Sequence, residues 1–410
     1  MERLSIDFGH LWRAHSANQV AFETILFVLP TLAATLYDAS PGEIALVTAA
    51  STLPALLFAL PAGVWIDRRT RAPVLRLTAL ARAVLVVGLT AGLWFGLGTP
   101  VQLAVMAFCF AGLAMVGDIA AVALVPQLVQ DNQLGRANAR LELMRSLAQV
   151  AAPALAGVAL AVTGPTGPTA LAAGLLLVAA ISFQRISVVE QVAARGPSRP
   201  WPEMVEGLRF VFQTRVLRDL SLSAALWTFG ATGMKAAIVV LALSDLELGA
   251  DAFGIALAAA GAGGLLGGVM VEPLMRRISV GRIVAVGPLL GTIGYGLLVI
   301  TPSGPLAVAV LAAGLFLDGL GSTLWVVAAT TLRQSATPLG MLGRLAAVVR
   351  MIAASSRPLG ALTAGVIAEA VSARASLMVA MVAVAASLVL LVVSPVSRIK
   401  RAEDLRPDRG

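Results

Sequence analysis

Long blocks of apolar residues, separated by short segments with glycine, proline or charge, run along almost the whole chain. A helix needs about 20 mostly apolar residues to cross the hydrocarbon core of a bilayer. Twelve blocks approach or exceed that length, with approximate ranges 16–36, 43–66, 73–97, 101–126, 138–162, 167–187, 217–243, 252–274, 283–300, 305–328, 342–369 and 374–395. The pattern therefore predicts an all-α integral membrane protein with twelve transmembrane helices.

Composition agrees with lipid as the main solvent. Hydrophobic residues fill 58% of the 410 positions and charged residues 13%, whereas soluble domains carry roughly 25% charged residues. The net charge of +8 could indicate nucleic-acid binding, but most of the basic residues lie in loops and tails that would share one side of a membrane. They include Arg68, Arg69 and Arg71, then Arg276, Arg277 and Arg282, and Arg398, Lys400 and Arg401.

Basic loops stay cytoplasmic, and the opposite set of loops holds Arg374 as its single basic residue. We therefore expect both termini in the cytoplasm of a bacterium and the spans in its plasma (inner) membrane. The positive charge then sets the orientation of the chain in the membrane and attracts the anionic lipids of the inner leaflet. No nucleic-acid partner is expected.

Shifting the sequence by 205 residues aligns several features at once. Gly63-x3-Asp67-x3-Arg71 meets Gly268-x3-Glu272-x3-Arg276, and Arg145-x7-Pro153 meets Arg350-x7-Pro358. Two halves of six helices in the same orientation would produce this parallel repeat. We expect an N-terminal bundle (1–187), a cytoplasmic linker with an amphipathic helix at the membrane surface (188–216), a C-terminal bundle (217–397) and a basic tail (398–410).

Four stretches together resemble one known family. They are residues 63–71, with a Gly, an Asp and a basic cluster; 136–157, with Arg145 and Pro153; 206–211; and 342–361, with Arg350 and Pro358. The chain resembles the major facilitator superfamily, and within it the bacterial efflux group that contains the enterobactin exporter and macrolide efflux proteins. Thr70 stands where the family motif has its second Gly, and the antiporter motif survives as Ala152-Pro153-x3-Gly157.

The resemblance implies the family's fold, transport by alternating access, and a conformational motif on Gly63, Asp67, Arg68 and Arg71, echoed by Gly268, Glu272 and Arg276. It places Asp67 against the start of span eleven, near Gly343 and Arg344, where it would help to hold the outward-facing state. Gly63 would permit close helix packing there.

Ionisable groups inside a membrane cost about 2.5–3.5 kcal/mol on insertion scales, so each needs a reason. Glu23, Asp118 and Asp318 are the candidates for proton coupling, because burial moves a carboxyl pKa toward neutrality. The alternatives are a structural hydrogen bond for Glu23 and a structural pair with an arginine for Asp118.

The candidates for substrate binding are basic: Arg357, Arg145, Arg350 and Lys235. Arg145 and Arg350 either clamp acids in their own halves or together bind an anionic substrate, and Glu142 is the expected partner of Arg145. Arg357 lies in mid-span beside Pro358. Lys235 could extend toward Asp245 and Glu247 at the membrane surface.

Three glycine runs suit close helix packing: Gly88-x3-Gly92-x3-Gly96, Gly264-x3-Gly268 and Gly287-x3-Gly291.

The sequence lacks the phosphate-binding loop of an ATP-driven pump. His10 and His15 precede the first apolar block and Cys109 is the single cysteine, so we expect no enzyme, no metal site and no cofactor. The hypothesis is a monomeric, proton-coupled exporter of an amphipathic small molecule, drug-like or siderophore-like. The alternatives are an importer, a lipid or lysolipid transporter, and a non-transporting membrane sensor or scaffold.

Overall fold

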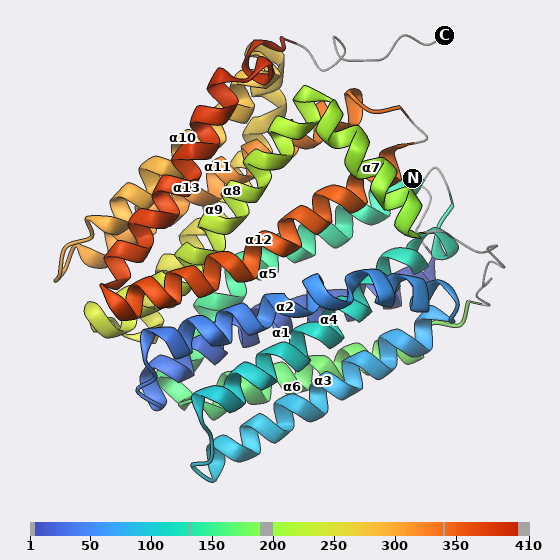
Figure 1. Ribbon diagram of the computed structural model, residues 1–410. Helices are drawn as coiled ribbons and strands as arrows, with labels where there is room; N and C mark the ends of the chain where they lie inside the picture. The colour runs from blue at the N-terminus through green and yellow to red at the C-terminus, as the bar shows by residue number, and fades with distance from the viewer. Residues whose placement is uncertain (1–4, 131–132, 189–199, 339–340, 401–410) are drawn as a thin grey trace. The chain divides into compact units, whose positions relative to one another are not determined.

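A computed structural model describes residues 5–130, 133–188, 200–338 and 341–400 of the chain, and these residues fold almost entirely into helices (Figure 1). The α-helices are α1 (Ile6–Leu36), α2 (Pro41–Asp67), α3 (Arg71–Trp94), α4 (Pro100–Leu128), α5 (Leu134–Thr163), α6 (Thr166–Gln184), α7 (Pro200–Gln213), α8 (Arg215–Val240), α9 (Ala250–Arg277), α10 (Val280–Val299), α11 (Ala307–Ser335), α12 (Leu342–Ala370) and α13 (Ala373–Val393).

In the described part of the chain, 12 helices are long and apolar enough to cross a membrane, and α7 is not among them. The predicted class is confirmed. The first span differs, because α1 begins at Ile6 instead of near residue 16. Ser5 caps it by accepting a hydrogen bond from the Phe8 amide at 3.1 Å, which is a favourable way to start a helix. His10 and His15 therefore lie within α1.

The helices form two compact units. Unit 1 contains residues 1–196 and the start of α9, residues 247–258; unit 2 contains residues 197–246 and 259–410.

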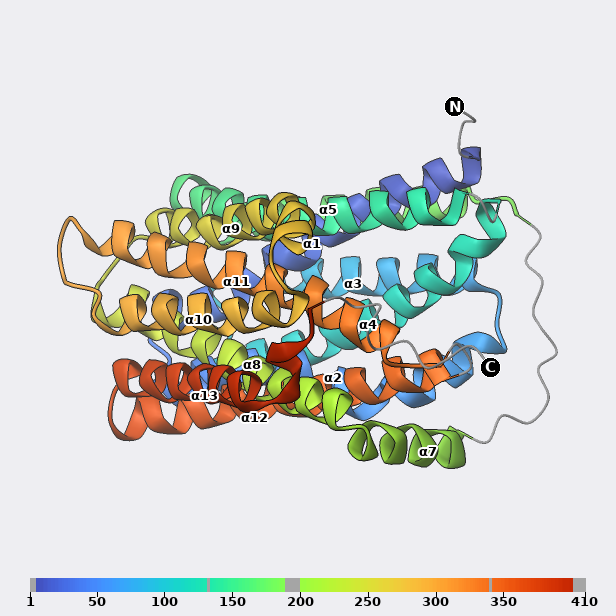
Figure 2. The ribbon, with the colours of Figure 1, turned by 90° about the horizontal axis from the view of Figure 1, so that it is seen from above.

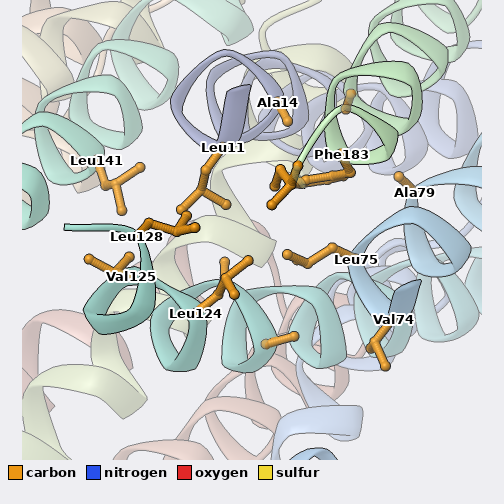
Figure 3. Close-up of a cluster of buried hydrophobic side chains, with 14 of the residues drawn as sticks. Leu11, Ala14, Val74, Leu75, Ala79, Leu124, Val125, Leu128, Leu141 and Phe183 are labelled. Carbon is orange, nitrogen blue, oxygen red and sulfur yellow. The ribbon is translucent and has the colours of Figure 1, made fainter. Parts of the chain in front are cut away.

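A core of apolar side chains fills one end of unit 1 (Figure 3). Leu11 of α1, Leu75 of α3, Leu124 of α4, Leu141 of α5 and Phe183 of α6 point toward one another there, and each is at most 9% exposed. Five of the unit's helices thus converge at this end, which fixes their mutual rotation and the directions of the polar side chains deeper in the bundle.

Unit 2 is held together by close contact between the α10 and α11 backbones. A Cβ atom added at Gly294 would lie 2.5 Å from the Gly314 carbonyl oxygen, and one added at Gly314 would lie 2.7 Å from the Gly294 carbonyl oxygen. Gly287 and Gly321 form an equivalent pair one heptad away, at 2.7 and 2.5 Å. Only glycine allows this approach.

The packing expected of the glycine runs is found at Gly287 and Gly291, where an added Cβ would meet Trp325 and Trp227 respectively. At Gly63, Gly88 and Gly268, by contrast, no described atom lies within 4 Å of an added Cβ. The close packing expected at these three positions is therefore not seen among the described residues.

Helix α7 packs against protein. Its Val211 is fully buried with Leu217, Leu345 and Val348, and Leu208 covers the same cluster. The expected amphipathic helix is therefore present, but part of its apolar face is used against α8 and α12, which also lie beside α13 in unit 2 (Figure 2). Phe212 is 43% exposed.

Candidate functional site

In unit 1 a fully buried arginine organises the polar interior. Arg82, on α3, is 1% exposed, and its Nη2 donates a hydrogen bond to Asn18 Oδ1 on α1. Its guanidinium lies 5.4 Å from the centroid of the Phe110 ring on α4, and Phe110 stacks on Phe22 of α1. A cation above an aromatic face is attracted by the ring quadrupole. Nε and Nη1 of Arg82 have no hydrogen-bond partner among the described residues.

Asp118, on α4, is the acidic member of this group. Its side chain is exposed, and the positive charges of Arg82 and Arg145 both act on it. Arg145, on α5, is also exposed and acts on His15 of α1 as well. We call Asn18, Arg82, Asp118 and Arg145 the N-cluster. It joins four helices of unit 1 around one accessible carboxylate.

Glu23 lies half-buried on α1, directly after Phe22 of the aromatic stack. The side chains of Glu142 and Arg350 lie outside the described residues, so the structure does not report on their expected roles.

In unit 2 the polar groups are arranged differently. Asp318, on α11, is half-buried, and its Oδ1 is enclosed without a hydrogen-bond partner in the described chain. The hydroxyl group of Tyr295, on α10, is also enclosed and interacts with the Asp318 carboxyl group without a hydrogen bond of good geometry. The charge of Lys235, on α8, acts on Asp318, and the Lys235 side chain is exposed. We call Lys235, Tyr295 and Asp318 the C-cluster.

The partner found for Lys235 differs from the expected one. The charge that acts on Asp245 is that of Arg374, while Lys235 acts on Asp318. Arg374 also donates hydrogen bonds to the Val299 and Thr301 carbonyl oxygens at 2.5 and 2.7 Å. It thereby caps the C-terminus of α10, which explains the single basic residue in this set of loops.

Arg357 is exposed on α12, beside the buried Pro358. A further buried cation, Arg333 of α11, donates a hydrogen bond to the Leu220 carbonyl oxygen at 2.9 Å and lies 5.3 Å from the Trp325 ring centroid. Trp325 stacks on Trp227 of α8. The position 205 residues before Trp227 is Phe22. In both units, therefore, an aromatic residue of the first helix stacks on an aromatic residue of the fourth span, and an arginine lies above the ring from the fourth span.

The conformational motif is partly described. Glu272 and Arg276 form an exposed ion pair at 2.7 Å, Arg68 is exposed and Arg71 is buried. The side chains of Asp67 and Arg344 lie outside the described residues, so their expected contact is not addressed.

The remnant of the antiporter motif lies at a tight helix crossing within unit 1. A Cβ added at Gly254, near the start of α9, would lie 2.7 Å from the Pro153 carbonyl oxygen and 3.3 Å from Gly157 Cα. Phe253, the preceding residue, packs against Phe27 of α1 with 5.8 Å between ring centroids. Pro153 and Gly157 therefore hold the first turns of α9 against α5 and α1.

Within the described residues, no three His, Cys, Asp or Glu side chains form a group that could hold a metal ion. An open apolar groove of about 560 Å³ lies between α2, α3 and α4, lined by residues such as Phe58, Phe108 and Cys109. None of its lining residues is charged.

Two bundles of membrane-length helices with charged interiors define a polytopic transport protein. The sequence profile of the Major Facilitator Superfamily matches residues 11–361, and the chain belongs to this family. It is a transporter and not an enzyme.

Among curated relatives, the multidrug efflux pump Tap of Mycobacterium tuberculosis is 27% identical over 83% of this chain and 82% of its own length. The enterobactin exporter EntS of Salmonella choleraesuis is 28% identical over 57% of this chain and 54% of its own. The crystal structure of a bacterial homologue of the iron transporter ferroportin, in an inward-facing state, superimposes with a TM-score of 0.73 at 17% identity. That match covers 94% of this chain and 98% of the other, and it supports the fold.

Tyr295 is a functional candidate to which the sequence assigned no role, whereas Arg82 is an intramembrane arginine of the kind expected to pair with Asp118. The chain contains only two tyrosines, Tyr37 and Tyr295, and a phenol in the middle of a glycine-rich apolar span indicates a polar partner on another helix. That signal was available for Tyr295. Nothing in the sequence pairs Arg82 with Asn18.

Proposed function

We propose that this transporter exports an amphipathic small molecule in exchange for protons by alternating access, and that Asp118 carries the exchanged proton. The observation behind this is the exposed Asp118 carboxylate beside the buried Arg82. Arg82 cannot usefully give up its proton and is held by Asn18 and Phe110. It is a fixed positive charge, so the titrating member of the pair is Asp118.

Exchange requires that proton and substrate exclude each other from the protein, because two ligands that compete for one site are transported alternately. An exposed carboxylate meets this requirement. It binds either a proton or the polar group of a substrate. Glu23, next to Phe22 in α1, is a second carrier in this proposal, and Arg145 and Arg357 are the proposed contacts for polar groups of the substrate.

The relatives support the direction of transport. One is named as a multidrug efflux pump and another as an enterobactin exporter. We further propose a monomer in a bacterial inner membrane with both termini in the cytoplasm, because of the placement of Lys and Arg in the loops.

The test is uptake of ethidium, a fluorescent amphipathic cation, into proteoliposomes. Vesicles with an acidic lumen are compared with vesicles that have the same pH inside and outside. Protein molecules that are inserted inside-out should accumulate ethidium in the lumen only when the lumen is acidic. In the Asp118→Asn and Glu23→Gln variants the gradient-driven rate of ethidium uptake should fall at least about tenfold, which corresponds to a free-energy change of one pKa unit.

The matched control is Asp38→Asn, at an exposed turn residue with φ 44°, where Asn also tolerates the left-handed conformation. If Asp118→Asn and Glu23→Gln both retain the full gradient-driven rate, the coupling assignment is wrong. Uptake that requires the opposite gradient would instead indicate an importer. A panel of compounds tested for growth inhibition, in cells without their own pumps, would then identify substrates.

A further inference from the structure

We propose that unit 2 binds the headgroup of one anionic phospholipid in a site built by residues 394–400, which we call the C-terminal strap. Basic side chains of the strap and of α10 contact the lipid phosphate, and the outer face of α13 contacts its acyl chains. The proposal concerns a lipid partner and does not depend on the direction of transport or on proton coupling.

A buried polar contact anchors the beginning of the strap. Asp219 of α8 is 4% exposed and accepts a hydrogen bond from Ser394 Oγ at 2.6 Å. A short 3-10 helix, η4 (Pro395–Arg398), follows at once and places Val396 in the same apolar core as Leu391 of α13. The chain therefore leaves α13 in a fixed direction and stays packed against unit 2.

The far end of the strap crosses the start of α10 (Figure 1). The Gly281 amide donates a hydrogen bond to the Ile399 carbonyl oxygen at 3.1 Å. The Val280 amide donates one to the Lys400 carbonyl oxygen at 3.3 Å. These amides belong to the first turn of α10, whose N–H groups have no partner within the helix. A Cβ added at Gly281 would overlap the Val396 carbonyl oxygen, so the crossing requires glycine.

The crossing brings three basic residues to one end of the unit. Arg282 follows directly in α10, and Arg398 and Lys400 lie on either side of the strap residue that α10 contacts; all three are exposed. Within the described residues none of the three forms an ion pair, whereas Arg276 of α9 is paired with Glu272 at 2.7 Å. Three cations without a carboxylate partner are a suitable site for a phosphate group, because hydrogen bonds between charged groups are the strong ones.

An apolar surface beside these cations indicates a lipid instead of a soluble anion. Large apolar residues on one face of α13 are exposed, and the last of them is 74% exposed directly before the strap. They are Met378, Val382, Val389 and Val393. Because α13 is long and apolar enough to cross a membrane, this stripe faces hydrocarbon and ends where the basic residues begin. A phospholipid offers both parts in that order, an acyl chain and then a phosphate.

The strap differs from an ordinary basic loop in having a fixed backbone. Every loop with arginines attracts anionic lipid to some extent. In the strap, hydrogen bonds from α10 hold the backbone that carries Arg398 and Lys400, so less conformational freedom is lost when a headgroup binds. We therefore expect one tightly bound lipid here and only diffuse attraction at other basic loops.

Native mass spectrometry of the detergent-solubilised protein, titrated with dioleoyl phosphatidylglycerol, measures the dissociation constant of the first lipid bound. Dioleoyl phosphatidylcholine has the same acyl chains and no net charge, and it is the reference lipid. The anionic lipid should bind at least about tenfold more tightly, since each basic residue near a membrane surface contributes roughly a fivefold factor.

The first variant removes the three cations of the site: Arg282→Gln, Arg398→Gln and Lys400→Gln. The matched control removes three exposed arginines of unit 1: Arg69→Gln, Arg76→Gln and Arg185→Gln. The site variant should weaken phosphatidylglycerol binding at least about tenfold and leave phosphatidylcholine binding unchanged, whereas the control should change either by less than about twofold.

The second variant moves the strap and changes no charge. Gly281→Ala should weaken phosphatidylglycerol binding at least about fivefold, because the cations are no longer held in place. Gly268→Ala in α9 is the matched control, since no described atom lies within 4 Å of an added Cβ there. If Gly281→Ala does not fold, the two triple variants decide the question, because their six residues are all exposed.

Equal weakening by the two triple variants would overturn the proposal, because it would indicate diffuse attraction to the whole basic surface. Unchanged phosphatidylglycerol binding by folded Gly281→Ala would overturn it as well, since the strap would then have no part in the site. Displacement of the lipid by an equal concentration of glycerol 3-phosphate would also reject it, and would identify a soluble phosphate as the occupant.

Discussion

Asp118 and Asp318 both lie on the fourth span of their unit, yet their surroundings differ. Asp118 is exposed and is acted on by two arginines, while Asp318 is partly enclosed by a tyrosine and is acted on by one lysine. The 205-residue repeat places Leu113 opposite Asp318 and Thr323 opposite Asp118. Two copies of one helical scaffold have therefore acquired different polar interiors. The two aspartates can consequently have different roles in binding protons and substrate.

The helix packing differs in the same way. In α10, Gly294 contacts the α11 backbone, whereas Gly88, in the third helix of unit 1, has no described atom within 4 Å of an added Cβ. We expect Gly294→Leu to destabilise the protein by more than the ~3 kcal/mol of ordinary overpacking, so that little folded protein is recovered. Gly88→Leu should be neutral or slightly stabilising, since leucine favours a helix.

Yield of monodisperse protein by size-exclusion chromatography and unfolding in SDS mixed micelles measure both variants. Equal behaviour of the two would mean that the α10–α11 contact is not what holds unit 2 together.

The second comparison concerns the two buried arginines. Arg82 donates a hydrogen bond to Asn18, and its charge acts on Asp118. Arg333 donates a hydrogen bond to a backbone carbonyl oxygen and lies above the Trp325 ring, and no acidic group of the described chain acts on it. Arg82→Ala should cost about 3 kcal/mol, because it removes a buried guanidinium group with its hydrogen bond to Asn18 and one of the two positive charges that act on Asp118. Arg333→Ala should cost about 2 kcal/mol, from one hydrogen bond and one cation–π contact.

Adding Asp118→Asn to Arg82→Ala should recover part of the loss, because it removes the negative charge that has lost one of its two positive partners. SDS-driven unfolding of both single variants and the double variant measures this coupling. Strictly additive losses would show that Arg82 supports the fold independently of Asp118.

These comparisons also show what could be predicted from sequence. The spans were predictable because crossing a bilayer depends on the hydrophobic length of a single segment, which neighbouring helices do not alter. The start of α1 was not, because ten polar and apolar residues before the predicted span join the helix by packing Leu11 and Ala14 into the unit 1 core.

The pairing of charges was harder to predict, because it depends on helix rotation. Lys235 was expected to extend along its own helix toward Asp245, yet its charge acts on Asp318 of α11. His15 was expected before the first span, and it lies on α1 where Arg145 acts on it. Both contacts join helices far apart in sequence, and no periodicity within one helix reports them.

The third comparison separates the two carboxylates directly. Asp118→Asn should abolish the stimulation of ethidium uptake by a proton gradient, at least about a tenfold loss, which is ~1.4 kcal/mol of coupling. Asp318→Asn should retain the stimulation within about twofold. The reverse result, with coupling lost only in Asp318→Asn, would exchange the roles assigned to the two units.

The smallest effect is expected where each unit ties its first helix to the end of its last. In unit 2 the buried Asp219 of α8 accepts a hydrogen bond from Ser394 Oγ at 2.6 Å and one from Arg218 Nε at 3.2 Å. In unit 1 Asp7 of α1 accepts from the Ser187 amide and hydroxyl groups at 3.2–3.3 Å, at an exposed site. An amide cannot accept both bonds at Asp219, so Asp219→Asn should cost about 1 kcal/mol in SDS-driven unfolding. Asp7→Asn should cost less than about 0.5 kcal/mol, because water replaces what is lost at an exposed pair. Equal costs would mean that burial does not distinguish these two ties.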